Sequence, residues 1–164
     1  MGTNTKSAVR VMDAARRLVR ALAGSARAVE TRSGISGAQM FILTQLGGMD
    51  RPCSVNELAE LTLTHQSTVS GVVTRLVERR LVKRTTSPDD ARRVDIELTA
   101  RGRALLADAS PTLQAQLVNS LARLSPSECA ALADALDAWL EGAGLGSHPA
   151  PLFFEIDMGG AERE

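Results

Sequence analysis

At 164 residues the chain has the length of one domain, and its 44% content of apolar residues excludes an intrinsically disordered protein. Its 19 basic and 19 acidic residues give a net charge of zero, which by itself argues against a nucleic-acid partner. The charges are separated along the chain, however, because residues 72–103 carry a net +4 and residues 104–164 a net −7. Such a chain can bind a polyanion with one face.

A long N-terminal helix is predicted over residues 7–31, where apolar side chains such as Val9, Met12 and Val19 recur at helical spacing. Because only 2% of the chain is aromatic, Ala, Leu and Val must build the core, and an α-rich fold is favoured. The helix has more apolar surface than a small monomer can cover, which indicates a dimerisation helix. An ordinary core helix is the alternative.

Two shorter helices follow, each with a recognisable N-cap. Ser36 can cap a helix that ends at a glycine pair, and residues 49–53 then form a turn. Ser54 and Glu57 form an S-x-x-E capping box, in which each side chain binds the other residue's backbone amide. This box predicts a third helix over residues 55–61.

The fourth predicted helix, over residues 65–79, has two chemically different faces. Small polar side chains occupy its beginning and one face, whereas the other face carries an apolar stripe of Val69, Val72, Val73, Leu76 and Val77. A short helix, a short turn and a second helix with a polar face form the helix-turn-helix plan. In that plan the second helix enters the major groove of DNA.

Two strands are predicted directly afterwards, over residues 81–86 and 93–98, because apolar and polar residues alternate in both. Residues 87–90, with the sequence SPDD, have the composition of a turn. A basic β-hairpin behind a helix-turn-helix is the layout of a winged helix, in which the hairpin reaches the neighbouring DNA backbone or minor groove.

The last third of the chain is predicted to be helical. Thr99 can cap a fifth helix that extends through Leu121, with a kink or break near Ser110 because Pro111 follows it. A second capping box, with the sequence SPSE at residues 125–128, begins a sixth helix.

The tail, residues 144–164, contains the apolar segment 151–156. This segment is interpreted either as a loosely held terminus or as an arm that packs across a partner subunit.

Four short motifs, in this order and spacing, resemble the MarR family of bacterial transcriptional regulators over roughly residues 8–143. They are Gln66-Ser67-Thr68-Val69-Ser70, Leu81-Val82-Lys83-Arg84, the D-x-R wing motif Asp90-Ala91-Arg92 and the L-T-x-x-G helix start Leu98-Thr99-Ala100-Arg101-Gly102. One position departs from the family pattern, since Arg80 stands where the family usually has glycine. A left-handed Arg80 would cost about 1 kcal/mol, unless the helix ends differently.

The resemblance implies a mainly α winged helix-turn-helix with a two-stranded β-wing and long N- and C-terminal dimerisation helices. The expected division is an N-terminal dimerisation helix (7–32), a DNA-binding domain (36–100), C-terminal dimerisation helices (101–143) and the tail (144–164). The implied function is that of a homodimeric regulator, a repressor, on a pseudo-palindromic operator in double-stranded DNA. A small anionic or aromatic effector is expected to release it.

The DNA-binding side chains are expected on the fourth helix and the wing. Gln66 is expected to read adenine, and Arg75 to read guanine or hold a phosphate. Arg92 is expected to enter the minor groove, held in direction by Asp90. The full predicted set is His65, Gln66, Ser67, Thr68, Ser70, Thr74, Arg75, Lys83, Arg84, Asp90, Arg92 and Arg93. His65 is either a base reader or a helix cap.

For the effector, Arg16 or Arg20 is expected to meet a carboxylate, with Met40 and Phe41 as an apolar wall. The alternative is that both arginines are ordinary surface charges. A thiol switch at Cys53 is a second hypothesis, because the helix that begins next to it can lower a thiol pKa. A winged helix that binds only proteins is a third.

An enzyme is not expected, because the two histidines have no carboxylate or cysteine at useful spacing and no phosphate-binding loop or paired-acid motif is present. Cys53 and Cys129 have no metal-type spacing, so neither a metal nor another cofactor is expected. Because no apolar run has the length of a membrane span or of a signal peptide, a cytoplasmic protein without a membrane partner is expected.

Overall fold

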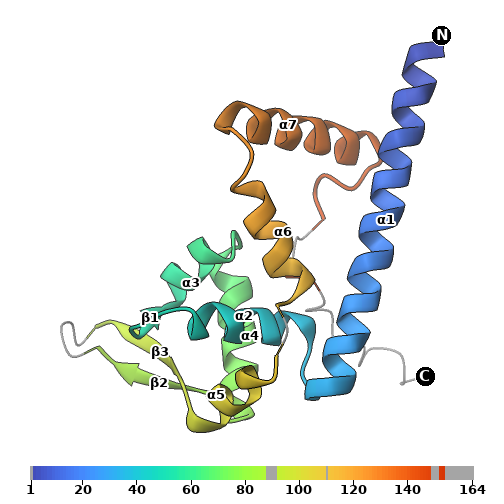
Figure 1. Ribbon diagram of the computed structural model, residues 1–164. Helices are drawn as coiled ribbons and strands as arrows, with labels where there is room; N and C mark the ends of the chain where they lie inside the picture. The colour runs from blue at the N-terminus through green and yellow to red at the C-terminus, as the bar shows by residue number, and fades with distance from the viewer. Residues whose placement is uncertain (1, 88–91, 110, 149–151, 154–164) are drawn as a thin grey trace, which may run out of the picture.

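The computed structural model describes residues 2–87, 92–109, 111–148 and 152–153, which form a mainly α fold with a small sheet (Figure 1). This confirms the predicted winged helix-turn-helix architecture. Its elements in chain order are α1 (Gly2–Ser33), α2 (Gly37–Gly47), β1 (Cys53–Ser54), α3 (Val55–Leu61), α4 (Gln66–Glu78), β2 (Val82–Thr86), β3 (Val94–Leu98), α5 (Ala100–Ala107), α6 (Leu113–Leu121) and α7 (Pro126–Gly142). Among the described helices, none is both long and apolar enough to cross a membrane.

Reciprocal hydrogen bonds at helix starts explain why several boundaries were readable from the sequence. Three helices begin with a capping box, in which side chains satisfy backbone amides that have no partner within the helix. The pairs are Ser36 with Gln39, Ser54 with Glu57 and Ser125 with Glu128. The predicted starts of α2, α3 and α7 are therefore confirmed.

The predicted fifth helix is two helices. α5 ends at Ala107, and α6 begins after Thr112, whose hydroxyl accepts a hydrogen bond from the amide of Ala115. Pro111 lies between them, where its missing N–H group and its ring prevent a continuous helix. The break predicted near this proline is confirmed.

The sheet has a strand that the sequence analysis missed. β3 lies in the centre of the order β1-β3-β2 and is antiparallel to both neighbours, with Ile96 opposite Cys53 on one side and Arg84 on the other. The predicted turn at residues 49–53 therefore ends in a strand, and the two-stranded wing is part of a three-stranded sheet. Because β1 runs directly into α3, the sheet joins the wing to the helix-turn-helix.

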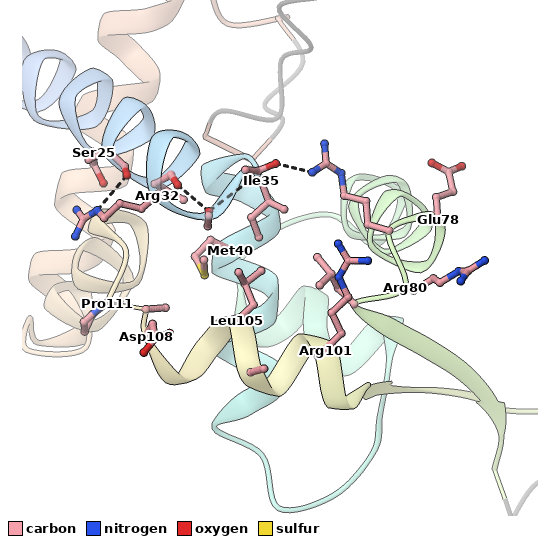
Figure 2. Close-up of a pocket in the computed structure, with 18 residues that line it drawn as sticks. Ser25, Arg32, Ile35, Met40, Glu78, Arg80, Arg101, Leu105, Asp108 and Pro111 are labelled. Atoms are coloured by element: carbon pink, nitrogen blue, oxygen red, sulfur yellow. Dashed lines mark hydrogen bonds between the residues drawn. The ribbon is translucent and has the colours of Figure 1, made fainter.

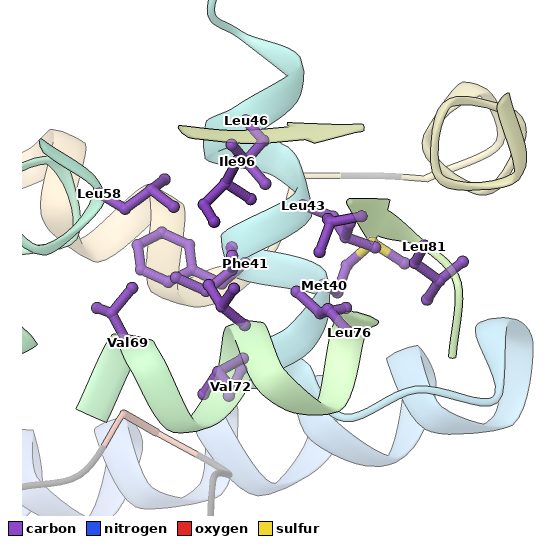
Figure 3. Close-up of a cluster of buried hydrophobic side chains, with 14 of the residues drawn as sticks. Met40, Phe41, Leu43, Leu46, Leu58, Val69, Val72, Leu76, Leu81 and Ile96 are labelled. Carbon is purple, nitrogen blue, oxygen red and sulfur yellow. The ribbon is translucent and has the colours of Figure 1, made fainter. Parts of the chain in front are cut away.

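A single apolar core lies between α2, α3, α4 and the sheet (Figure 3). The Phe41 ring lies at its centre among Leu58, Val69, Val72 and Ile96, all of which are fully buried. The buried stripe predicted for α4 is confirmed, with Val77 only partly covered. Burying one such side chain stabilises the fold by roughly 1.5–3 kcal/mol.

Both helices of the helix-turn-helix end in a left-handed residue that is not glycine. Arg80 has φ 58° and Leu63 has φ 50°. After α4, the amide of Arg80 donates to the carbonyl of Val77 at 2.8 Å and the amide of Leu81 to that of Leu76 at 2.9 Å, which is a Schellman motif. Arg80 thus has the strained conformation that glycine tolerates better.

The L-T-x-x-G sequence at the start of α5 fits a very close backbone approach. The Thr99 amide and hydroxyl both donate to the carbonyl oxygen of Leu81, at 3.1 Å each. A Cβ atom on Gly102 would lie 2.1 Å from that same oxygen. Glycine is therefore required here for α5 to pack against the beginning of the wing.

We predict that Arg80→Gly raises the free energy of unfolding by about 1 kcal/mol, because glycine removes the cost of a left-handed Cβ. Urea unfolding followed by circular dichroism measures this. The matched change Arg101→Gly, in the first turn of α5, should instead lower stability by roughly 0.5–1 kcal/mol. Equal effects of the two changes would contradict the assignment of strain to Arg80.

Candidate nucleic-acid interface

The polar face of α4 is exposed along its length. The side chains of Gln66, Ser67 and Thr74 are exposed, while Thr68, Ser70 and Arg75 are partly buried at the edges of the apolar stripe. His65 occupies the N-cap position and is exposed, but its side chain makes no capping hydrogen bond. The predicted residues of α4 thus lie on the solvent side of one helix, whose other side is fixed in the core.

The beginning of the wing is joined to this face by Arg84. Its Nη2 atom donates to the hydroxyl of Thr74 at 3.0 Å, and that hydroxyl donates to the carbonyl of Ser70 at 2.9 Å. Lys83 forms an ion pair at 2.7 Å with Glu97, its neighbour across the sheet. The structure therefore brings one exposed basic side chain of β2, that of Arg84, next to the polar face of α4.

The two arginines after the wing tip are in different environments. Arg92 is exposed, whereas Arg93 is partly buried, with Nε 2.7 Å from Asp95 and Nη2 2.7 Å from Glu57. Asp90 lies outside the described residues, so its pairing with Arg92 stays a prediction.

Glu57 is the centre of a charged cluster with Arg51, Arg93 and Asp95. Its carboxylate accepts hydrogen bonds from Arg51 at 2.6 Å, from Arg93 at 2.7 Å and from both the amide and the hydroxyl of Ser54. The hydrogen bonds from Arg51 and Ser54 lower the pKa of Glu57 to about 2. The hydrogen bond to Asp95 raises the pKa of Arg93 above its ordinary value.

From the sequence, Glu57 is predicted only as a helix cap, and neither Arg51 nor Asp95 is predicted to belong to a site. The sequence gives no signal for Asp95, because it stands at a polar position of an alternating strand, and its exposed fraction of only 6% is seen in the structure alone. A buried carboxylate within a strand requires a cationic or hydrogen-bonding partner nearby.

The structure contradicts the expectation that Cys53 has a lowered pKa. The thiol is fully buried between β3 and α3. Burial, followed by the negative charge of Glu57, raises its pKa to about 11. Desolvation of the thiolate therefore outweighs the effect of the neighbouring helix start, and Cys53 is unsuited to sensing oxidants.

The four residues predicted to bind an effector do not come together. Phe41 is buried in the core, Arg20 is exposed on α1, and Arg16 is exposed and pairs with Asp13 at 2.9 Å. Only Met40 lines a cavity of about 850 Å³ between α1, α2, α4 and α5, where it faces Leu105 (Figure 2). Around this cavity lie Arg32, Arg79, Arg80 and Arg101, with Glu78 and Asp108.

Among the residues that the structure describes, no three His, Cys, Asp or Glu side chains gather closely enough to hold a metal ion.

We predict an acid-sensitive contribution of Glu57 to stability. Its pKa is lowered from 4.5 to about 2 by folding, so this contribution is complete above about pH 4.5 and is lost as the pH falls towards 2. Over that range, the stability of the wild type should fall more steeply than that of Glu57→Gln, measured by urea unfolding. Glu78→Gln, which removes an exposed carboxylate of α4, should keep the wild-type slope.

We also predict that Cys53 is inert in the folded protein. With a pKa of about 11, only about one thiol in a thousand is ionised at pH ~8, and the sulfur is covered. In a Cys129→Ser variant, colour release from a disulfide reagent should follow global unfolding in urea. Rapid stoichiometric reaction of that variant without denaturant would restore the thiol-switch hypothesis.

Comparisons with known proteins agree with this geometry. The MarR family profile matches residues 33–93. The HTH-type transcriptional repressor NicR of Pseudomonas putida is 46% identical over 55 residues, 34% of this chain and 35% of NicR, so the match spans about a third of that relative.

Solved structures give longer matches. A probable transcriptional regulator from Pseudomonas aeruginosa is 33% identical, with a TM-score of 0.50 over 74% of this chain and 92% of its own. The S. aureus MepR–DNA complex shares the fold, with 21% identity and a TM-score of 0.54 over 77% of this chain and 93% of MepR. From its sequence motifs, its winged fold and these relatives, the chain belongs to the MarR family.

Proposed function

We propose that this chain is a sequence-specific, DNA-binding transcriptional regulator, a repressor that acts as a homodimer and is released by a small-molecule effector. The observation that carries the proposal is the joining of the polar face of α4 to the basic wing through Arg84 and Thr74. NicR is a transcriptional repressor and MepR was solved with DNA, which supports the same role here. We therefore propose that the protein is not an enzyme. We also propose that it acts in the cytoplasm, where the bacterial chromosome lies.

In this proposal α4 enters the major groove and the wing follows the backbone to the minor groove. Gln66 reads adenine, Arg75 reads guanine or holds a phosphate, and Arg92 enters the minor groove beside Asp90. Lys83 and Arg84 hold the backbone. Ser67, Thr68 and Ser70 of α4 suit phosphate and sugar oxygens. Thr74 of α4 and the N-cap residue His65 complete the set that faces the groove.

A second copy of the chain is proposed as the partner of α1 and α7. In Figure 1 both helices extend away from the winged domain. Their exposed apolar side chains include Val9, Val11, Met12, Leu18 and Val19 on α1 and Leu132, Leu136, Trp139 and Leu140 on α7. α7 has no buried residue in the single chain. Apolar faces of this extent require a cover, and a two-fold dimer through residues 7–32 and 101–143 would place two copies of α4 on a pseudo-palindrome.

The effector is proposed to bind in the cavity that Met40 lines, and not at Arg16 or Arg20. Val29, Ile35, Met40 and Leu105 give this cavity an apolar wall, and its four arginines outnumber its two acids. This lining suits an apolar carboxylate. Arg79, at the C-cap of α4, also donates to the carbonyl of Gly34 between α1 and α2. A ligand here would therefore touch the junction between the dimerisation helix and the helix that reads DNA.

We predict that the protein shifts duplex DNA from the region upstream of its own gene, with an affinity that falls steeply as salt rises. Arg92→Ala should weaken binding by roughly 1–3 kcal/mol, measured by fluorescence anisotropy. Arg123→Ala, at the exposed end of α6, is the control and should bind as the wild type does. A folded dimer that binds no DNA at low salt would point to the protein-binding alternative.

We further predict that one member of a panel of aromatic and aliphatic carboxylates lowers DNA affinity at least about tenfold, a typical allosteric coupling. Arg101→Ala should raise the concentration of that carboxylate needed for release by about tenfold, since a charge-assisted contact is lost. Arg20→Ala should leave it unchanged. If Arg20→Ala raised that concentration and Arg101→Ala did not, the effector would bind at α1 instead of in the cavity.

A further inference from the structure

Arg93 fastens the wing through both its backbone and its side chain. Its carbonyl accepts a hydrogen bond from the amide of Ser87 at 2.8 Å, which pairs the two arms of the hairpin next to its tip. Its guanidinium donates to Asp95 of the following strand β3 and to Glu57 of α3, each at 2.7 Å. One residue therefore connects the far end of the hairpin to the first helix of the helix-turn-helix.

Breaking the ion pair between Arg93 and Asp95 would be unfavourable because Asp95 is buried. It lies on the central strand β3, opposite Ser54 of β1 and Thr85 of β2, and it is only 6% exposed. A buried carboxylate that loses its cationic partner is strongly unfavourable. If Arg93 turned towards a DNA phosphate, the buried carboxylate of Asp95 would lose its cationic partner.

The cluster is also electrically neutral. Arg51 and Arg93 supply two positive charges, and Glu57 and Asp95 supply two negative charges. A phosphate brought to Arg93 would approach both carboxylates as well, so the cluster as a whole offers little attraction to a polyanion. The neighbouring Arg92 is exposed.

We propose that Arg93, Glu57 and Asp95 are positioning residues that fix the direction of the wing relative to α3 and so deliver Arg92 to the DNA. Arg93 itself makes no phosphate contact, which replaces the role that the sequence analysis gave it. The inference rests on the proposed DNA-binding function. It deepens that function by assigning the wing geometry to three residues that do not touch the ligand.

Glu57→Gln gives a test in which the two roles of Arg93 predict opposite signs. Glutamine keeps the capping box, which accepts either residue, but removes the charge that holds Arg93. If Arg93 positions the wing, the variant loses DNA affinity. If Arg93 contacts a phosphate, the variant binds more tightly, because it frees the arginine and removes a repelling carboxylate.

The measurement is fluorescence anisotropy with a fluorescent duplex of the operator at several salt concentrations, after thermal melts show that each variant is folded. Arg93→Met and Glu57→Gln should each weaken binding about tenfold, and the double variant should be no weaker than either alone. Because each change weakens delivery of Arg92, both should reduce the slope of log Kd against log salt by the same amount, at most about one. Arg92→Met is the control for a direct contact and should reduce that slope by about one.

Tighter binding by Glu57→Gln, or a salt slope that Arg93→Met reduces and Glu57→Gln does not, would overturn the proposal. Amide hydrogen exchange separates this result from failure of DNA binding itself. In both variants residues 82–86 and 94–98 should lose protection while α4 keeps it, whether or not the wild type binds the duplex. Unchanged protection of the wing would overturn the inference independently.

Discussion

Burial of α2 is the constraint on which the rest of the structure depends. This short helix packs against α1, α3, α4, α5 and β3, and the Phe41 ring fills the space between them. The polar face of α4 can stay exposed because its other face is held by this core. The surface proposed to read DNA is thus a consequence of apolar packing on its reverse side, and its rigidity comes from the same source.

Hydrogen bonds and ion pairs then fix the orientations of α5 and of the wing, which apolar packing alone does not determine. The Thr99 and Gly102 contacts with Leu81 place α5 against the beginning of the wing. The Glu57 cluster ties the other end of the hairpin to α3. These bonds are directional where the hydrophobic effect is not, so they decide the angle of a hairpin that has little core of its own.

Outside the winged domain the single chain leaves apolar side chains exposed. α1 and α7 expose apolar residues as large as Trp139, and the cavity beside Arg79 lies where α1 meets the α4 end of the winged domain. A second copy on these helices and a ligand in this cavity would act on the same junction. The ligand would then regulate DNA binding if its affinity differed between two arrangements of the two α4 helices in the dimer.

The sequence by itself determined the helix starts, the break at Pro111, the polar face of α4 and the family, because capping, proline and helical periodicity act over a few residues. Only the tertiary structure decided the roles of Phe41, Cys53, Arg93 and Asp95. Phe41 is core and not a ligand wall, and Cys53 is buried and not activated. Arg93 meets Glu57, which lies 36 residues away in the chain. Burial and ion pairing depend on which distant segments meet, and no local pattern around these residues encodes that.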